Sequence, residues 1–162
     1  MTKLSLTFFI SAAIVFSGPT MAAAAAAPAP GAMALHGEVK LETTTVVNGI
    51  EKTVLATPKV VVPGNRLLFS TSYRNESATP VQNFVVTNPV PEGIAVAATD
   101  AASLTVSADG GKTWGKLATL TVKDAKGLAR PAQSADVTHV RWTLATIAPG
   151  TGGAVAYHAI VK

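Results

Sequence analysis

Cysteine is absent from the 162 residues of this chain. Its absence excludes disulfide frameworks, thiol catalysis and zinc–thiolate sites. Charged residues are scarce as well, at 14% of the sequence, and the lysines and arginines form no cluster. The net charge of +4 is therefore spread along the chain, so a nucleic-acid-binding surface is not expected.

Long helical patterns are missing too. Gly and Pro recur too often for helices of about ten residues or more, and no convincing 3.6-residue hydrophobic period is kept. One long apolar run stands near the N-terminus, where Lys3 precedes residues 4–16 and Gly18-Pro19 and an alanine-rich stretch follow. This order is typical of a signal peptide, and the run is shorter than a membrane-spanning helix requires.

The sequence therefore predicts an exported protein in three parts. Residues 1–27 are the expected signal peptide, with cleavage between positions 22 and 34, residues 28–36 are an expected flexible leader, and residues 37–162 are the expected domain. After cleavage about 125 to 130 residues remain, which is enough for one hydrophobic core. We expect a periplasmic, extracellular or cell-surface location, with no membrane insertion of the processed protein.

From Gly37 onward, β-branched residues dominate and turn signals recur at short intervals. Asn48-Gly49 is a strong hairpin signal, because both positions tolerate positive φ. Residues 66–74 alternate between an apolar face, which includes Leu67 and Phe69, and a polar one. We predict strands at residues 39–47, 50–56, 60–62, 66–74, 81–87, 94–98, 104–108, 113–117, 120–123, 137–144 and 154–161, with a loop over 124–135.

Many short strands separated by Gly, Pro and Asn turns predict an all-β fold. The expected architecture is an antiparallel, immunoglobulin-like β-sandwich of about seven to nine strands. Val140 and Trp142, on one side of the strand at 137–144, are expected to face the core, as are Val155, Tyr157 and Ala159 on the last strand.

The octapeptide SADGGKTW, residues 107–114, resembles the Asp-box of sialidases and other β-propellers. The resemblance implies a structural hairpin turn made by Ser107, Asp109, Gly111, Thr113 and Trp114. A propeller needs at least about four blades, which this chain cannot supply. No carboxylate pair for glycoside hydrolysis is evident either. We therefore predict a structural turn here and no catalytic residues.

Two further stretches carry a second resemblance. Residues 62–75, VPGNRLLFSTSYRN, and residues 84–93, FVVTNPVPEG, resemble a bacterial-surface immunoglobulin-like "conserved repeat" domain, and a final strand after Pro149-Gly150 adds weaker support. The resemblance covers about residues 60–162 and implies a sandwich used in secreted and cell-surface proteins, often as tandem spacers. This chain holds a single copy, with Asn88 where the family usually has Asp. The family implies no catalytic residues.

Metal and sugar sites have little support. His139 and His158 would share a ligand only if they lay on paired strands, and His36 could bind copper only if processing made it the first residue. Asp109, Asp124 and Asp136 lack the spacing of a calcium loop, so three separate turns explain them. Neither a metal site nor a cofactor is predicted, and Trp114 and Trp142 are expected to be core or half-buried anchors.

The sequence thus predicts a non-enzymatic structural or interaction module, for example a subunit of a surface assembly. Protein partners or self-association are expected, through hydrogen bonding at free strand edges. The leader with residues 39–47 is the candidate for a strand donated to a partner. The alternative is a secreted carbohydrate- or metal-binding module, in which Trp114 would stack on a glycan or the histidines would pair.

Overall fold

The computed structural model describes residues 32–162. The predicted signal peptide and the first four residues of the predicted leader lie outside the described residues. Within the described part of the chain, neither the short α-helix nor the 3-10 turns are long and apolar enough to cross a bilayer.

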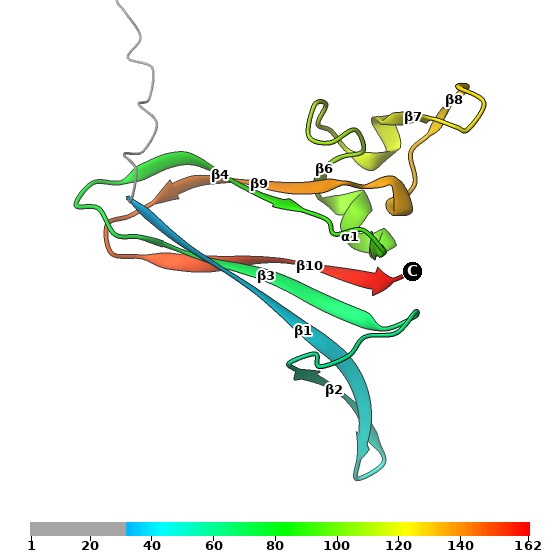
Figure 1. The fold of residues 1–162 in the computed structure, drawn as a ribbon. Coiled ribbons are helices and arrows are strands. Elements are labelled where there is room, and N and C mark those ends of the chain that lie inside the picture. The colour runs from blue at the N-terminus through cyan, green and yellow to red at the C-terminus, as the bar shows by residue number, and fades with distance from the viewer. Residues whose placement is uncertain (1–31) are drawn as a thin grey trace, which may run out of the picture.

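Two antiparallel sheets face each other as the layers of a sandwich (Figure 1). The larger sheet has the strand order β2-β1-β3-β10-β5 and consists of β1 (Met33–Val47), β2 (Ile50–Ala56), β3 (Arg66–Asn75), β5 (Ile94–Val96) and β10 (Gly152–Val161). The smaller has the order β4-β9-β6 and consists of β4 (Val81–Pro89), β6 (Thr105–Ser107) and β9 (His139–Ile147). The predicted all-β sandwich is confirmed.

A small outlying sheet and three short helical segments complete the fold. They are β7 (Thr121–Lys123), β8 (Ala129–Pro131), the helix α1 (Ala98–Ser103) and the 3-10 turns η1 (Leu117–Thr119) and η2 (Ser134–Asp136). The two sheets of the sandwich hold eight strands, within the expected seven to nine, and β7 and β8 bring the described residues to ten.

The core lies between the two sheets and is built from the alternating faces that the sequence indicated. Leu67 on β3, Val140 on β9 and Tyr157 on β10 are each at most 3% exposed. The Tyr157 ring stacks on Phe69 with centroids 5.0 Å apart. Trp142 is half-buried and packs against this cluster. Burial of these side chains provides the main driving force for closing the sandwich.

The first strand is longer than predicted. Its residues 33–42 pair with β3, so the last four residues of the expected flexible leader form part of the large sheet. Ala34 and Gly37 have weak strand preference, but pairing with β3 overrides it, since strand propensity depends strongly on context. Residues 39–47, the candidate donated strand, are already paired with β3 or β2 of their own chain. These residues would have to leave their own sheet before they could be donated to a partner.

Four further differences concern short segments. Residues 60–62 form no strand and lie in an exposed loop between Pro58 and Pro63. The expected strand at 113–117 contributes only Gly115, which bridges to Val106. The expected loop at 124–135 contains β8 and the start of η2. The expected strand at 94–98 ends at Val96, and α1 follows because the sequence there is rich in alanine.

Candidate functional site

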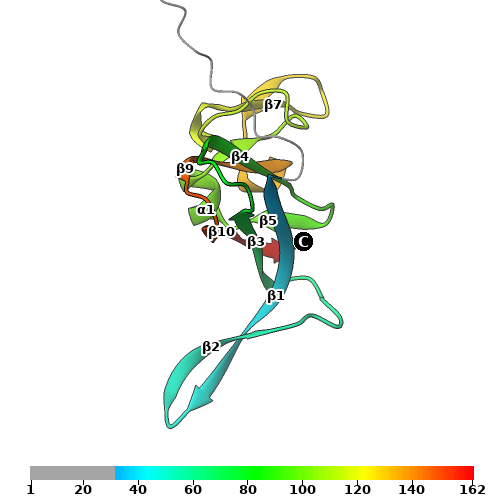
Figure 2. The ribbon, with the colours of Figure 1, turned by 90° about the vertical axis from the view of Figure 1, so that its left-hand side faces the viewer.

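The hairpin formed by β1 and β2 extends beyond the sandwich (Figures 1 and 2). We call residues 43–56 the arm. Pairing between β1 and β3 ends at Glu42 and Arg66, so beyond this point only β2 accompanies β1. Asn48 and Gly49 form the turn at the tip, with φ of 55° and 79°, and β2 has the predicted bounds. Every residue of the arm is exposed.

Apolar side chains are concentrated on this arm. It carries five of the twelve exposed large hydrophobic residues of the described chain, namely Val46, Val47, Ile50, Val54 and Leu55. The loop that follows adds Val60, Val61 and Val62. Exposed apolar side chains gathered in this way commonly mark an interaction site, because their contact with water is unfavourable. A two-stranded ribbon in water is also only marginally stable by itself.

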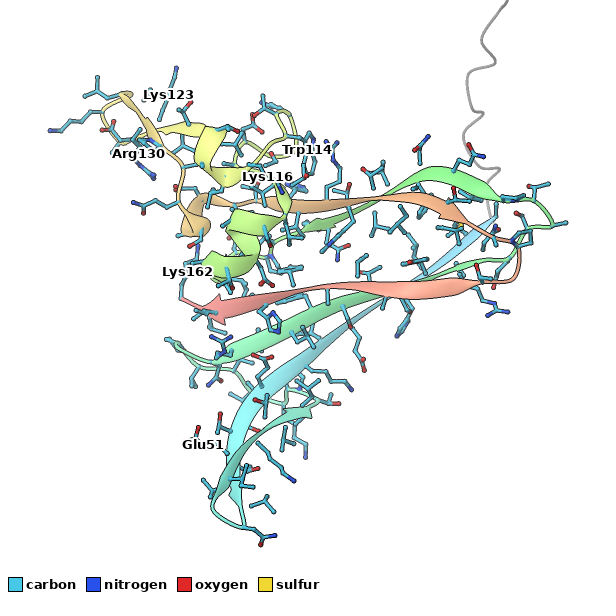
Figure 3. The ribbon with its side chains drawn as sticks, turned by 180° about the vertical axis from the view of Figure 1, so that it is seen from behind. Glu51, Trp114, Lys116, Lys123, Arg130 and Lys162 are labelled. Atoms are coloured by element: carbon cyan, nitrogen blue, oxygen red, sulfur yellow. The ribbon has the colours of Figure 1, made fainter. Side chains whose placement is uncertain are left out.

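The two faces of the arm are similar in character. Directly opposed residues share a face, so the pair Val47–Ile50 lies on the same side as Val54, while Val46 and Leu55 lie on the other. The only charged residues of the arm are Glu51 and Lys52, which gives it a formal charge of zero. Glu51 stands at the opposite end of the molecule from Lys123 and Arg130 (Figure 3).

The outer edge of β2 presents unpaired backbone groups. In a hairpin with a two-residue turn, the residues that flank the turn are hydrogen-bonded to each other, here Val47 and Ile50. Because backbone groups alternate in direction along a strand, those of Glu51, Thr53 and Leu55 point away from β1. No strand of the described residues pairs with this edge.

A network of ionisable side chains fixes the base of the arm. Glu42 accepts a hydrogen bond from Arg66 Nε at 3.2 Å, and its other oxygen lies 3.3 Å from His158 Nε2. The second ring nitrogen of His158 lies 3.0 Å from an Asp100 carboxylate oxygen. The network joins β1, β3, β10 and α1. Its members are far apart in the sequence, so no local motif could have predicted it.

The Asp-box-like residues lie together in one turn, which is closed by two backbone hydrogen bonds between Val106 and Gly115. The Asp109 carboxylate accepts from the hydroxyl of Thr113 at 2.7 Å and from that of Ser107 at 2.8 Å. Hydrogen bonds, above all from the Thr113 backbone N–H and hydroxyl, hold the pKa of Asp109 well below its ordinary value. The acceptor positions of this carboxylate are occupied within the turn.

The tryptophan of this motif is held on several sides. Trp114 donates its indole N–H to the Gly111 carbonyl at 2.8 Å. The Arg141 guanidinium lies 4.1 Å from the ring centroid, and His139 contacts the ring in an edge-to-face arrangement. The guanidinium therefore covers one face of the indole ring, and a bound sugar could not stack on that face.

The histidines and aspartates are dispersed. His139 lies on β9 and His158 on β10, in different sheets, so the pairing needed for a shared metal does not occur. Asp124 accepts backbone hydrogen bonds from its own turn. Asp136 forms a two-pronged ion pair with Arg130, and this pairing lowers the pKa of Asp136 and raises that of Arg130. Among residues 32–162, no three side chains of metal-binding type come together.

Comparison with known proteins adds no assignment: no protein family, curated protein or solved structure matches this chain.

Proposed function

We propose that this chain is an exported, non-enzymatic interaction module that docks onto protein partners through the edge of β2. It would act outside the cytoplasm as a structural subunit or adaptor of a periplasmic, extracellular or cell-surface assembly. The signal-peptide pattern at residues 1–27 supports export.

The observation that carries the proposal is the arm. A projecting hairpin that is exposed on both faces contributes little to the stability of the sandwich, yet it places five large apolar side chains in water. Its backbone edge at Glu51, Thr53 and Leu55 can receive a further strand. Strand addition of this kind obtains affinity from main-chain hydrogen bonds and specificity from alternate side chains.

The polar clusters support a structural rather than a chemical role. The Asp109 carboxylate accepts hydrogen bonds within its own turn, and Asp136 forms an ion pair with Arg130. His158 links α1 to the large sheet through Asp100. Each group is thus engaged by a neighbour that fixes the fold. The carbohydrate- or metal-binding alternative has weaker support, because Trp114 is covered by Arg141 and the histidines are apart.

Site-specific photo-crosslinking in cells that produce the full chain tests the proposal. A photoreactive amino acid replaces Leu55 on β2 or, as a control, Val85 on β4. These two side chains are similarly exposed, at 47% and 46%. We expect illumination to yield a discrete higher-mass adduct from position 55 and none from position 85. Absence of an adduct at position 55, or equal labelling at both positions, would show that the edge of β2 is not a docking surface.

A further inference from the structure

We infer that the partner of the arm is the arm of a second copy of this chain, joined by antiparallel pairing of β2 with β2 about Thr53. This inference rests on the proposed function and specifies its partner. Pairing of the two β2 strands would join two exposed two-stranded ribbons into one four-stranded sheet. A sheet usually needs at least three strands to be stable.

Symmetry limits the registers that two copies can adopt. A two-fold axis perpendicular to the sheet pairs odd-numbered residues with odd-numbered ones and even with even. An axis at Thr53 therefore places Thr53 opposite Thr53 of the other copy, and Glu51 opposite Leu55. All three outward-facing residues of each copy are used in this register, which gives about six main-chain hydrogen bonds.

Charge disfavours the neighbouring registers nearer the tip. An axis at Glu51 would place two carboxylates opposite each other, and an axis at Lys52 would place two ammonium groups opposite each other. An axis at Thr53 sets Lys52 opposite Val54 and avoids both conflicts. It also brings the Val54 side chains of the two copies into diagonal contact on one face of the sheet, next to Ile50.

The shape and charge of the arm suit a second copy. Its formal charge of zero means that two arms do not repel each other, although the whole chain is positive. The arm projects away from the two layers, so its tip and outer edge lie outside the sandwich (Figures 1 and 2). Pairing along the seven residues of β2 gives a contact at the lower end of interface sizes. We therefore expect a reversible dimer that dissociates on dilution.

Sedimentation of the processed full chain from about 1 µM to about 1 mM measures the association directly. Wild type should pass from monomer to dimer in this range. Thr53→Pro removes an outward N–H and no bond to β1, so it should weaken association at least tenfold. Thr53→Val keeps the backbone donor and is the matched control, which should dimerise like wild type.

The lack of native cysteine permits a clean test of register. Thr53→Cys places two thiols opposite each other, about 5.5 Å apart between Cα atoms, which fits disulfide geometry. Mild oxidation should therefore yield a covalent dimer. Leu55→Cys alone should not, because residue 55 faces residue 51. A mixture of Glu51→Cys and Leu55→Cys chains should again cross-link.

Three results would overturn the inference: a wild-type chain that stays monomeric at about 1 mM, a Thr53→Cys variant that cross-links no faster than Leu55→Cys, or a photo-adduct at position 55 with a mass other than that of two chains. The last result would leave docking by the arm intact and exclude only the second copy as its partner. No photo-adduct at position 55 would refute both proposals.

Discussion

The side-chain amide of Asn75 donates a 3.0 Å hydrogen bond to the carbonyl oxygen of Ile147 and thereby connects the end of β3 in the large sheet to the end of β9 in the small one. The same amide donates to the Thr79 carbonyl, and its oxygen accepts from the Ser77 N–H and hydroxyl. Asn75 is fully buried. One side chain thus satisfies polar groups of both layers in a place that water does not reach.

We expect Asn75→Asp to destabilise the fold by about 3 kcal/mol, because an aspartate cannot donate to the two carbonyls and leaves them unpaired. Urea unfolding followed by circular dichroism measures the loss. Ser77→Ala is the control and should cost about 1 kcal/mol, since it removes hydrogen bonds at the exposed end of the network only. A stability within 0.5 kcal/mol of wild type for Asn75→Asp, the scale of an ordinary surface change, would contradict this account.

The Asp109 turn predicts an acid-dependent effect. Because folding lowers the pKa of Asp109 from its ordinary value of 3.8, the carboxylate stabilises the fold fully above that value, and this contribution falls as the pH drops below it. Asp109→Ala should therefore lower the melting temperature at pH 7. The difference from wild type should narrow as the pH falls below 3.8. A difference that stays constant across the titration would show that the charge plays no part.

Tyr157 predicts a stabilising substitution. Its hydroxyl is buried and has no hydrogen-bond partner among the described residues. Tyr157→Phe should therefore raise the free energy of unfolding by about 1 kcal/mol. Burial also raises the pKa of Tyr157 from 10.0 to about 12, so the stability of the wild type should decline as the pH rises through this interval. The free energy of unfolding of Tyr157→Phe should fall less over the same pH interval. Destabilisation of that variant at pH 7 would reveal a hydrogen bond to water.

Gly152 begins β10 and pairs with Arg74 of the neighbouring strand β3. A Cβ atom at this position would lie 2.2 Å from the Tyr73 carbonyl oxygen, which belongs to the backbone and cannot move aside without disturbing the sheet. We expect Gly152→Ala to cost about 3 kcal/mol in urea unfolding. At Gly153 the obstacle is the Tyr73 hydroxyl, the far end of a side chain that can shift, so Gly153→Ala should cost less. Equal costs would refute this distinction.

Shortening the arm should leave the sandwich intact. Replacement of residues 44–53 by Asn-Gly recreates a two-residue turn between Thr43 and Val54, which form a hydrogen-bonded pair in the native hairpin. Because the removed residues are all exposed, the unfolding free energy of the dilute protein should stay within about 0.5 kcal/mol of wild type. A larger loss would mean that the arm supports the fold.

The sequence predicted those elements whose signals are local. Asn48-Gly49 requires positive φ and so fixed the hairpin, and the alternation at 66–74 identified the inward face of β3 correctly. The N-terminal half of β1 has no such pattern, because its partner strand rather than its own composition holds it in place. The short helix after β5 was missed because six residues give too little helical periodicity to recognise.

The site was predicted only in part. Free strand edges follow from any sandwich, but which edge stays open depends on topology, and the order β2-β1-β3 is not encoded in local pattern. The apolar residues of the arm resemble those of an ordinary buried strand. Their exposure is evident only from the structure, in which every residue of β2 is exposed. The Glu42–His158–Asp100 contacts likewise depend on strands far apart in the chain.

The continuity of β1 has a mechanical consequence. A single strand passes from the sheet into the arm without a break, and ten of its successive residues pair with β3, with hydrogen bonds at alternate positions. Those hydrogen bonds lie perpendicular to the strand, so tension applied to the arm along β1 loads them together in shear rather than one at a time. A load taken up at the tip would therefore be distributed over the whole length of the sandwich.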